Sequence, residues 1–327
     1  MEAQAPVDEN HPMSTLILAP ADVETVARTL VGATNVDGGP TDEQLAVLRA
    51  LLVHLWDRND LEPTSLTPLE PAAAADAITD PVTRRRLHEL IVVLEACRHP
   101  QSAAQVTRVE EYAGAFDVSG PELKIFRDAI DEGVARATED YDRFYAERLD
   151  DLSEPGLRGQ YLRIDEPDLE LAKQLEALHD LPEGTLGYAY MEFYRRNGIT
   201  VPGADTHTPA HYVSHDMNHV IAGYEPTGPG ELALAAFTLA MRDDEANWIQ
   251  FITSLIIHEA GILQHGAIMP KAATLTRPGA ADLFGDGFRR GAACTNDFSQ
   301  ADHLTMATWS LADVRQHYGV PAGDLLG

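Results

Sequence analysis

Cysteine and basic residues are scarce in this sequence. Cys97 and Cys294 are the two cysteines among 327 residues, and they form no Cys-x-x-Cys pair. A disulfide framework and a thiolate zinc site are therefore not expected, and a reducing cytoplasm is the favoured compartment. The 24 Lys and Arg residues stand against 52 Asp and Glu residues, which gives a formal net charge of −28. This charge argues against nucleic acid as a partner and against electrostatic docking on anionic lipid.

Long apolar runs and several familiar catalytic motifs are also absent. The apolar run at residues 16–19 is too short for a signal peptide. No stretch reaches the roughly 20 apolar residues that cross a bilayer, because polar side chains interrupt the best candidate, 248–263. The sequence has no Gly-x-Ser-x-Gly, no Gly-x-Gly-x-x-Gly after a strand and no Walker A motif. A serine hydrolase, a Rossmann oxidoreductase and a P-loop NTPase are thereby set aside.

Helical patterns are abundant. Thr41-Asp-Glu-Gln44 is a capping box that opens an amphipathic run to Trp56, and Asp80 before Pro81 opens another. No convincing alternation of apolar and polar residues, which is typical of strands, occurs. The sequence therefore predicts an all-α protein. Further helices are expected at about 168–179, 184–196, 209–222, 231–242, 244–264, 280–292 and 311–317.

The length suggests roughly two domains. We expect an N-terminal tail and first helix over 1–40, a helical domain over 41–148, a linker over 149–168 and a second helical domain over 169–327. The first domain includes a long helix after Ser119, in which apolar residues recur at helical spacing. The linker is polar, contains Gly and Pro, and lacks periodicity.

Histidine and carboxylate residues gather in the segment 206–241. His215 and His219 are spaced i, i+4, so both imidazoles project from one helix face and can share a metal ion. Asp216 projects about 100° from His215 and about 60° from His219, so it could ligate, orient a histidine or act as a base. The loop 223–230 can reverse the chain and return Glu231 beside His219. The candidate metal ligands are His215, Asp216, His219 and Glu231, and the candidate catalytic residues are Asp216 and Glu231.

The ends of the motif helix and the type of metal follow from residue type. Thr208 before Pro209 predicts the N-cap, and Gly223 predicts a left-handed C-terminal stop. Two imidazoles and two carboxylates suit a divalent metal, Zn²⁺ or alternatively Fe²⁺ or Mn²⁺. Zinc would restrict the chemistry to Lewis-acid or water activation, whereas a redox-active ion would permit O₂ chemistry. The alternative is that both histidines are surface residues and Glu231 only complements the helix dipole.

Other histidines are weaker candidates. His211 continues the spacing but lies about two turns from His219, so one ion could hardly take both ends of the series. His207 precedes the helix. His258 and His265 share a helix face about 10 Å apart, and we interpret them as partly exposed.

We interpret the basic and acidic clusters of the sequence as solvated surface and its apolar cluster as core. Arg195-Arg196 and Arg289-Arg290 could pair with a carboxylate or phosphate, but a solvated helix turn is the prediction for each. The acidic segment 57–62 is interpreted as a solvated loop. One apolar set is predicted as core and could also line a prenyl groove: Phe237, Trp248, Phe251, Ile252, Leu255 and Ile256.

The motif His215-Asp216-x-x-His219-x₁₁-Glu231 resembles the hallmark of the coenzyme Q (ubiquinone) biosynthesis protein 4 family. The flanking segment 181–190, LPEGTLGYAY, is similar to that family's "LPxGTxGxxY", and the C-terminal Trp309 with 314–320 is similar to its "W…R…LGI" ending. The resemblance covers about 165–322. It implies a mostly helical fold, a divalent metal at the four residues, a prenyl-lipid groove and peripheral membrane association, at an inner membrane if the protein is not purely cytoplasmic.

The N-terminal half departs from this family, whose eukaryotic members lack it. The segments 96–100, 109–113 and 119–123 (ACRHP, VEEYA and SGPEL) look like a TerB-type, tellurite-resistance-like helical bundle. That resemblance implies an interaction domain. The high Ala, Asp and Arg content, with little Lys, is typical of a high-GC bacterium.

Three functions are compatible with these observations. The first is metal-dependent oxidative decarboxylation of a polyprenylated aromatic acid, the activity with which the resembled family is associated. The second is a non-catalytic scaffold that binds a hydrophobic prenylated molecule, in which the metal serves structure. The third is a metal-dependent hydrolase with Asp216 as general base, which ranks last because aspartate has a shorter reach than glutamate. A homo-oligomer and a biosynthetic complex both stay open.

Overall fold

The structure is a computed structural model that describes residues 14–118, 139, 141–143, 145–147, 149–159, 166–263 and 269–322. Every regular element in these ranges is a helix, which confirms the all-α prediction. Two isolated β-bridges, between Thr185 and Ser310 and between Ala260 and Ala272, are the extended pairings among the described residues. The helix expected after Ser119, with Leu123, Phe126, Ile130 and Val134, lies outside the described residues.

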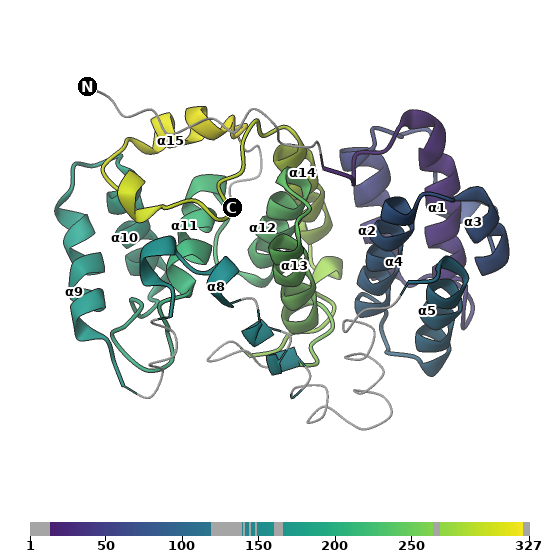
Figure 1. The fold of residues 1–327 in the computed structure, drawn as a ribbon, viewed down its shortest axis with the longest axis horizontal. Coiled ribbons are helices and arrows are strands. Elements are labelled where there is room, and N and C mark those ends of the chain that lie inside the picture. Colours follow the sequence, from purple (N-terminus) through teal and green to yellow (C-terminus); the bar gives the residue numbers. More distant parts are fainter. Residues whose placement is uncertain are drawn as a thin grey trace.

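The N-terminal helices form one group, on the right of Figure 1. Thr41 and Gln44 form the expected reciprocal capping box, and Asp80 accepts a hydrogen bond from the first turn of the helix that it was expected to open. Ser102 caps the next helix in the same way. Its elements are α1 (Pro20–Thr34), α2 (Asp42–Ala50), the π-helix η1 (Leu51–Leu55), η2 (Pro63–Ser65), α3 (Pro71–Ala77), α4 (Pro81–Ala96) and α5 (Ala103–Phe116).

The remaining helices form a central group and an outer group (Figure 1). The central group contains α12 (Gly228–Met241), α13 (Glu245–His258), η6 (Thr274–Thr276) and α14 (Ala280–Ala292). The outer group contains α8 (Leu149–Leu152), η3 (Pro155–Leu157), α9 (Leu169–Glu176), η5 (Ala177–Asp180), α10 (Leu186–Asn197), α11 (Tyr212–Ala222), η7 (Leu304–Met306) and α15 (Leu311–Tyr318).

Helices α12 and α14 pack backbone to backbone because α14 has glycine where they touch. A Cβ placed on Gly287 would lie 2.3 Å from the carbonyl oxygen of Ala233, and one on Gly291 would lie 2.0 Å from that of Phe237. Any larger residue would therefore force the helices apart. This close packing holds α12, and the Glu231 at its start, in a fixed position.

One of two apolar cores is shared by the N-terminal and the central helices. Buried side chains of α1, α2, η1 and α4 form a single cluster with others from α12, α13 and α14, whereas a second cluster lies among α9, α10, α11, α12 and α15. The N-terminal helices thus pack directly on the central helices. The expected division at 149–168 stays a prediction, although Glu154 within it is buried and accepts hydrogen bonds from His303 and the Leu304 amide.

Two expectations about helix ends are corrected. Helix α11 begins at Tyr212 without a side-chain cap, so Thr208 is not its N-cap. Asp205 instead accepts the amides of His207 and Thr208, which builds a separate turn before the helix. Helix α13 ends at His258, not near 264.

One expectation about the surface also changes, that for Arg290. Arg289 is exposed as expected, but Arg290 is buried. The apolar residues considered for a prenyl groove are all buried in the two cores, which confirms the core prediction and leaves no groove to them: Phe237, Trp248, Phe251, Ile252, Leu255 and Ile256. The acidic loop is solvated, and Asp60 and Glu62 pair with arginines there.

Candidate metal centre

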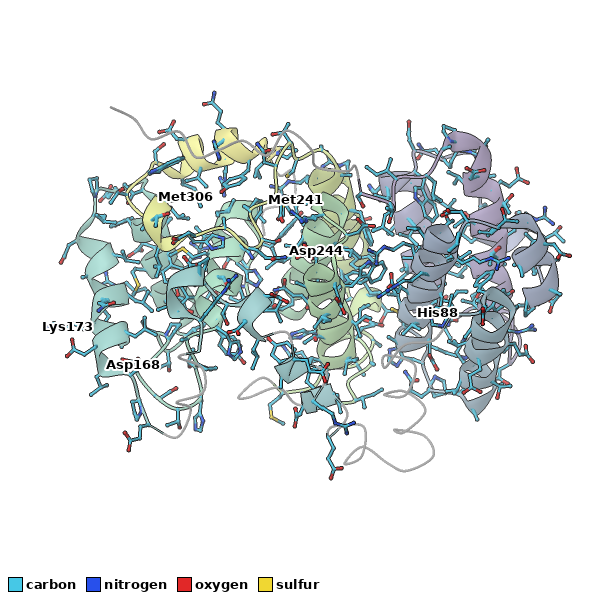
Figure 2. The ribbon with its side chains drawn as sticks, viewed as in Figure 1. His88, Asp168, Lys173, Met241, Asp244 and Met306 are labelled. Atoms are coloured by element: carbon cyan, nitrogen blue, oxygen red, sulfur yellow. The ribbon has the colours of Figure 1, made fainter. Side chains whose placement is uncertain are left out.

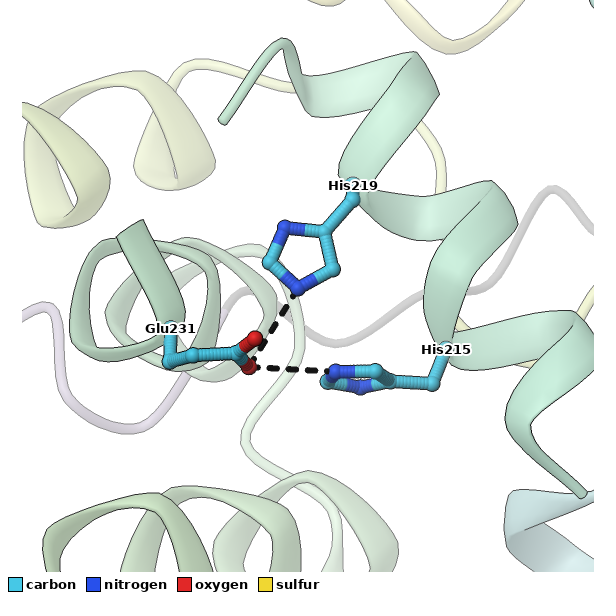
Figure 3. Close-up of side chains that lie close together, drawn as sticks. All are labelled: His215, His219 and Glu231. Carbon is cyan, nitrogen blue, oxygen red and sulfur yellow. Dashed lines mark hydrogen bonds and ion pairs between the residues drawn. The ribbon is translucent and has the colours of Figure 1, made fainter. Parts of the chain in front are cut away.

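Helices α11 and α12 bring His215, His219 and Glu231 together (Figure 3). The Nε2 atom of His215 lies 3.2 Å from Oε2 of Glu231, and the Nε2 atom of His219 lies 3.3 Å from the same oxygen. One ligand atom of each residue lies within 4.8 Å of the others. The i, i+4 spacing and the chain reversal after Gly223 (φ 85°) therefore bring together three of the four expected ligands, without Asp216.

The orientation of His219 prepares its Nε2 atom to bind a cation. Its Nδ1 atom lies 3.0 Å from the carbonyl oxygen of Tyr224, so Nδ1 carries the proton and donates it. In the neutral ring, Nε2 is then a lone pair that faces the Glu231 carboxylate. This buried nitrogen has no hydrogen-bond partner, and only a proton or a cation between the two groups removes the repulsion.

His215 is held from its other side by Gln250 on α13. The Nε2 amide of Gln250 donates to Nδ1 of His215 at 2.6 Å, so the neutral ring can donate from its own Nε2 to Glu231. A 180° rotation of the Gln250 amide would present its oxygen to a protonated Nδ1 and would leave Nε2 of His215 as a lone pair. Gln250 is therefore able to support either tautomer of His215.

The three residues fit a divalent metal. Zinc binds imidazole nitrogen and carboxylate oxygen at about 2.0–2.2 Å. Two such atoms separated by 3.2–3.3 Å subtend about 100° at a common ion, close to a tetrahedral angle. Burial would raise the pKa of Glu231, but His219 and His215 hold it well below its usual value, so the carboxylate is charged as a ligand must be.

Asp216 lies outside this group of three. Its Oδ2 accepts a short hydrogen bond from the Tyr194 hydroxyl on α10, and Tyr190 in turn donates to Tyr194. Burial raises the pKa of Asp216, although His215, His219 and Tyr194 oppose that rise. The structure thus places Asp216 beside the three clustered residues and bonded to a tyrosine pair, and not among the clustered ligand atoms as the spacing predicted.

A cavity of about 290 Å³ opens onto the centre. His215, Asp216 and Glu231 line it, whereas the side chain of His219 is fully buried behind them. Ligand pockets typically measure about 300–1,000 Å³, so this one suits a head group rather than a long chain. A metal held by three protein atoms would keep a coordination position open toward this space.

The other candidate histidines that the structure describes all line the cavity. His207 and His211 line the cavity, and the ring of His211 lies against Tyr145 and Tyr212. His258 is also buried and lines the cavity, so the expectation of a partly exposed helix residue is wrong for it. His265 lies outside the described residues. Arg195 and Arg196 are exposed, as expected.

Several supporting residues were not found from the sequence. The Tyr224 hydroxyl donates to Asp286 at 2.9 Å, and Arg290 donates to the Ala222 carbonyl at 2.7 Å. Arg315 donates to the carbonyls of Val220 and Ile221. These side chains satisfy the last carbonyls of α11 and fix the loop whose Tyr224 carbonyl holds His219. The only available signal was the presence of arginines in an acidic chain.

Comparison with known proteins gives two findings. Residues 157–243 match the sequence model of the coenzyme Q (ubiquinone) biosynthesis protein Coq4 family, a stretch that includes all four predicted ligands. A crystal structure of a Nostoc punctiforme PCC 73102 protein assigned to ubiquinone biosynthesis aligns with 74% of this chain and 99% of its own, at 17% identity and a TM-score of 0.34. No curated protein matches the chain. Among the described residues, no helix is both long and apolar enough to cross a membrane.

Proposed function

We propose that this protein acts in coenzyme Q (ubiquinone) biosynthesis as a metal-dependent enzyme. The observation that carries the proposal is the position of the triad. His215, His219 and Glu231 lie at the wall of a cavity, within the segment that matches the Coq4 family model. A structural metal would be closed by its ligands, whereas this arrangement leaves one side facing the cavity.

The proposed reaction is the oxidative decarboxylation of a polyprenylated aromatic acid. A divalent metal at the triad would supply Lewis acidity toward the acid group or, if it is iron or manganese, O₂ chemistry. Tyr145, Leu152, Ile199 and Tyr212 line the cavity and give the aromatic ring an apolar wall. Asp216 would hold the transferred proton at Oδ2, with Tyr194 as its hydrogen-bond donor.

The size of the cavity limits what it would enclose. About 290 Å³ accommodates an aromatic head group, so a polyprenyl tail would leave through the mouth. A tail outside the cavity would favour contact with a membrane surface. The TerB-like resemblance of the N-terminal helices supports an interaction role for that half, in which a biosynthetic complex is the proposed partner.

Metal analysis of the purified protein tests the proposal. We expect about one divalent ion per chain in the wild type and none in the His219→Ala variant, with His179→Ala on the surface as the control that keeps its metal. Equal metal content in wild type and His219→Ala would overturn the site. Metal-loaded protein should then consume a polyprenylated hydroxybenzoate in air, and mass spectrometry measures the loss of this acid. A metal-loaded protein that binds this acid without converting it would be a lipid-binding scaffold.

A further inference from the structure

Helix α13 is largely apolar, but the part of it that lines the cavity is mostly polar. Gln250, Thr253, Ser254 and His258 follow one another along a face of α13 and line the cavity. Lys271, which follows α13 in the chain, joins them there. All five residues lie beyond the segment 157–243 that matches the family model. The match to the family model therefore says nothing about the polar side chains on this part of the cavity wall.

Lys271 brings an unpaired positive charge to the cavity. It is the one Lys or Arg residue in the described lining, and no described carboxylate lies within ion-pair distance of its ammonium group. Lys271 is solvent-exposed, so its ammonium group is accessible to a ligand that enters the cavity. A ligand with a negative charge would supply the missing partner.

His258 provides a buried donor on the same wall. Its side chain is 5% exposed, and its Nδ1 atom has no hydrogen-bond partner among the described residues. A buried polar atom without a partner destabilises the protein, and a bound ligand can supply that partner. The backbone carbonyl of His258 accepts from Thr274, so the end of α13 is fixed independently of any ligand.

The N-terminal end of α12 adds to the positive character of this region. Gly228, its first residue, lines the cavity, and a Cβ placed there would lie 3.8 Å from Cδ of Lys271. The lysine stem therefore runs past the end of a 14-residue helix whose dipole is positive there. Gly230 and Glu231 already donate their amides to Thr227, which leaves the Gly228 end for a ligand.

The balance of charge around the triad also favours an anionic ligand. Two neutral imidazoles and one Glu231 carboxylate would leave a divalent ion with one net positive charge. Asp216, the other carboxylate in the lining, is engaged by Tyr194. With both carboxylates charged, the ion and Lys271 together would still leave one net positive charge at the cavity, which favours an anionic ligand.

We propose that Lys271, His258 and the N-terminal end of α12 form an oxyanion-binding subsite for the acidic head of the cavity ligand. The ligand class is an organic carboxylate or phosphate with an apolar body, because Leu152, Ile199 and Ile257 complete the lining. The proposal deepens the proposed function and rests on it for the position of the metal. The subsite itself consists of protein groups alone, so it can be examined with and without metal.

Isothermal titration of the full chain with 4-butylbenzoate, in metal-free and zinc-loaded forms, tests this subsite. The neutral analogue 4-butylbenzamide has nearly the same shape and should bind at least tenfold more weakly. Lys271→Met should weaken 4-butylbenzoate about tenfold or more and leave 4-butylbenzamide unchanged, and His258→Leu should act in the same direction. Arg277→Met is the matched control, since Arg277 is an exposed cation of the same segment that does not line the cavity.

The outcomes separate this subsite from the metal centre. Equal acid affinity in wild type and Lys271→Met, or no preference for the acid over the amide, would overturn the subsite even if zinc binds. Acid selectivity that persists in metal-free protein and falls in Lys271→Met would support it even if the metal assignment fails. Competition by inorganic phosphate would support a phosphate head group, and its absence beside tight acid binding would support a carboxylate.

Discussion

Two buried histidines show how the two halves of the molecule differ. His88 lies on α4 in the N-terminal group, labelled in Figure 2, and neither of its ring nitrogens has a hydrogen-bond partner. His219 on α11 is equally buried, but the Tyr224 carbonyl holds one nitrogen and the Glu231 carboxylate faces the other. The first histidine is a core residue, and the second is a candidate ligand whose ring orientation is fixed.

The comparison teaches that burial alone does not make a site. Burial lowers the pKa of His88 to about 4, so this ring stays neutral and behaves as an apolar filler. His219 differs because a carbonyl fixes its tautomer and a charged carboxylate lies across from its free nitrogen. Variants that remove these features one at a time separate the two environments experimentally.

Among these changes, removing the charge of Glu231 should lower metal affinity the most. Glu231→Gln keeps the shape of the side chain but removes the anionic ligand, so we expect zinc affinity to fall at least 100-fold. Competition with a chromophoric chelator measures this affinity. Glu225→Gln, on the exposed side of the same loop, should bind zinc as the wild type does. Undiminished zinc binding by Glu231→Gln would contradict the role of the carboxylate as a ligand.

His88 should make stability depend on pH in the acidic range. Its pKa is lowered from 6.5 to about 4, so the unfolded chain takes up a proton at a higher pH than the folded chain. The stabilisation is complete above about pH 6.5 and is lost as the pH falls toward 4, by roughly 3 kcal/mol. Urea unfolding of wild type and His88→Leu at several pH values measures it.

The His88→Leu variant should lose this part of the pH dependence and keep its metal. Leucine also removes two unsatisfied polar atoms, so stability at neutral pH should not fall by the cost of a lost hydrogen bond. A difference between the two proteins that does not change between pH 7 and pH 4 would contradict the assignment of His88 as a neutral core residue.

The groups that position His219 should have a smaller effect on the metal. Asp286→Asn weakens the contact that anchors the Tyr224 hydroxyl, and with it the carbonyl that fixes His219. Loss of such an outer contact typically costs 10–100-fold in metal affinity. The visible spectrum of the cobalt-substituted protein should change as well, which a purely structural loss of stability would not produce. A stability loss with unchanged cobalt affinity and spectrum would contradict this positioning role.

The sequence was sufficient for features that local chemistry decides. The capping box at Thr41, the end of α11 at Gly223 and the all-helical fold follow from backbone conformation and side-chain hydrogen bonds within a few residues. The meeting of His215, His219 and Glu231 also follows from helix periodicity and one reversal of the chain. These features need no knowledge of distant contacts.

The sequence was insufficient where partners are far apart in the chain. Arg290 resembles a solvated residue in its own helix, yet α14 turns it inward to the Ala222 carbonyl, 68 residues away. His258 is buried only because α13 ends there and faces the cavity. Asp216 is drawn from the metal cluster by Tyr194, a residue on another helix. Such outcomes depend on tertiary packing, which overrides local spacing.

The smallest expected effect comes from removing the side-chain cap of an N-terminal helix, which should change stability but not metal binding. Helix α2 begins with a side-chain cap at Thr41, whereas α11, which carries the histidines, begins without one. Thr41→Ala should therefore lower the free energy of unfolding by about 1 kcal/mol, with Thr41→Ser close to the wild type. Zinc affinity should not change, because α11 is held at its other end by Arg290 and Arg315. A fall in zinc affinity that accompanies the loss of this cap would show that the shared core transmits changes from the N-terminal helices to the metal centre.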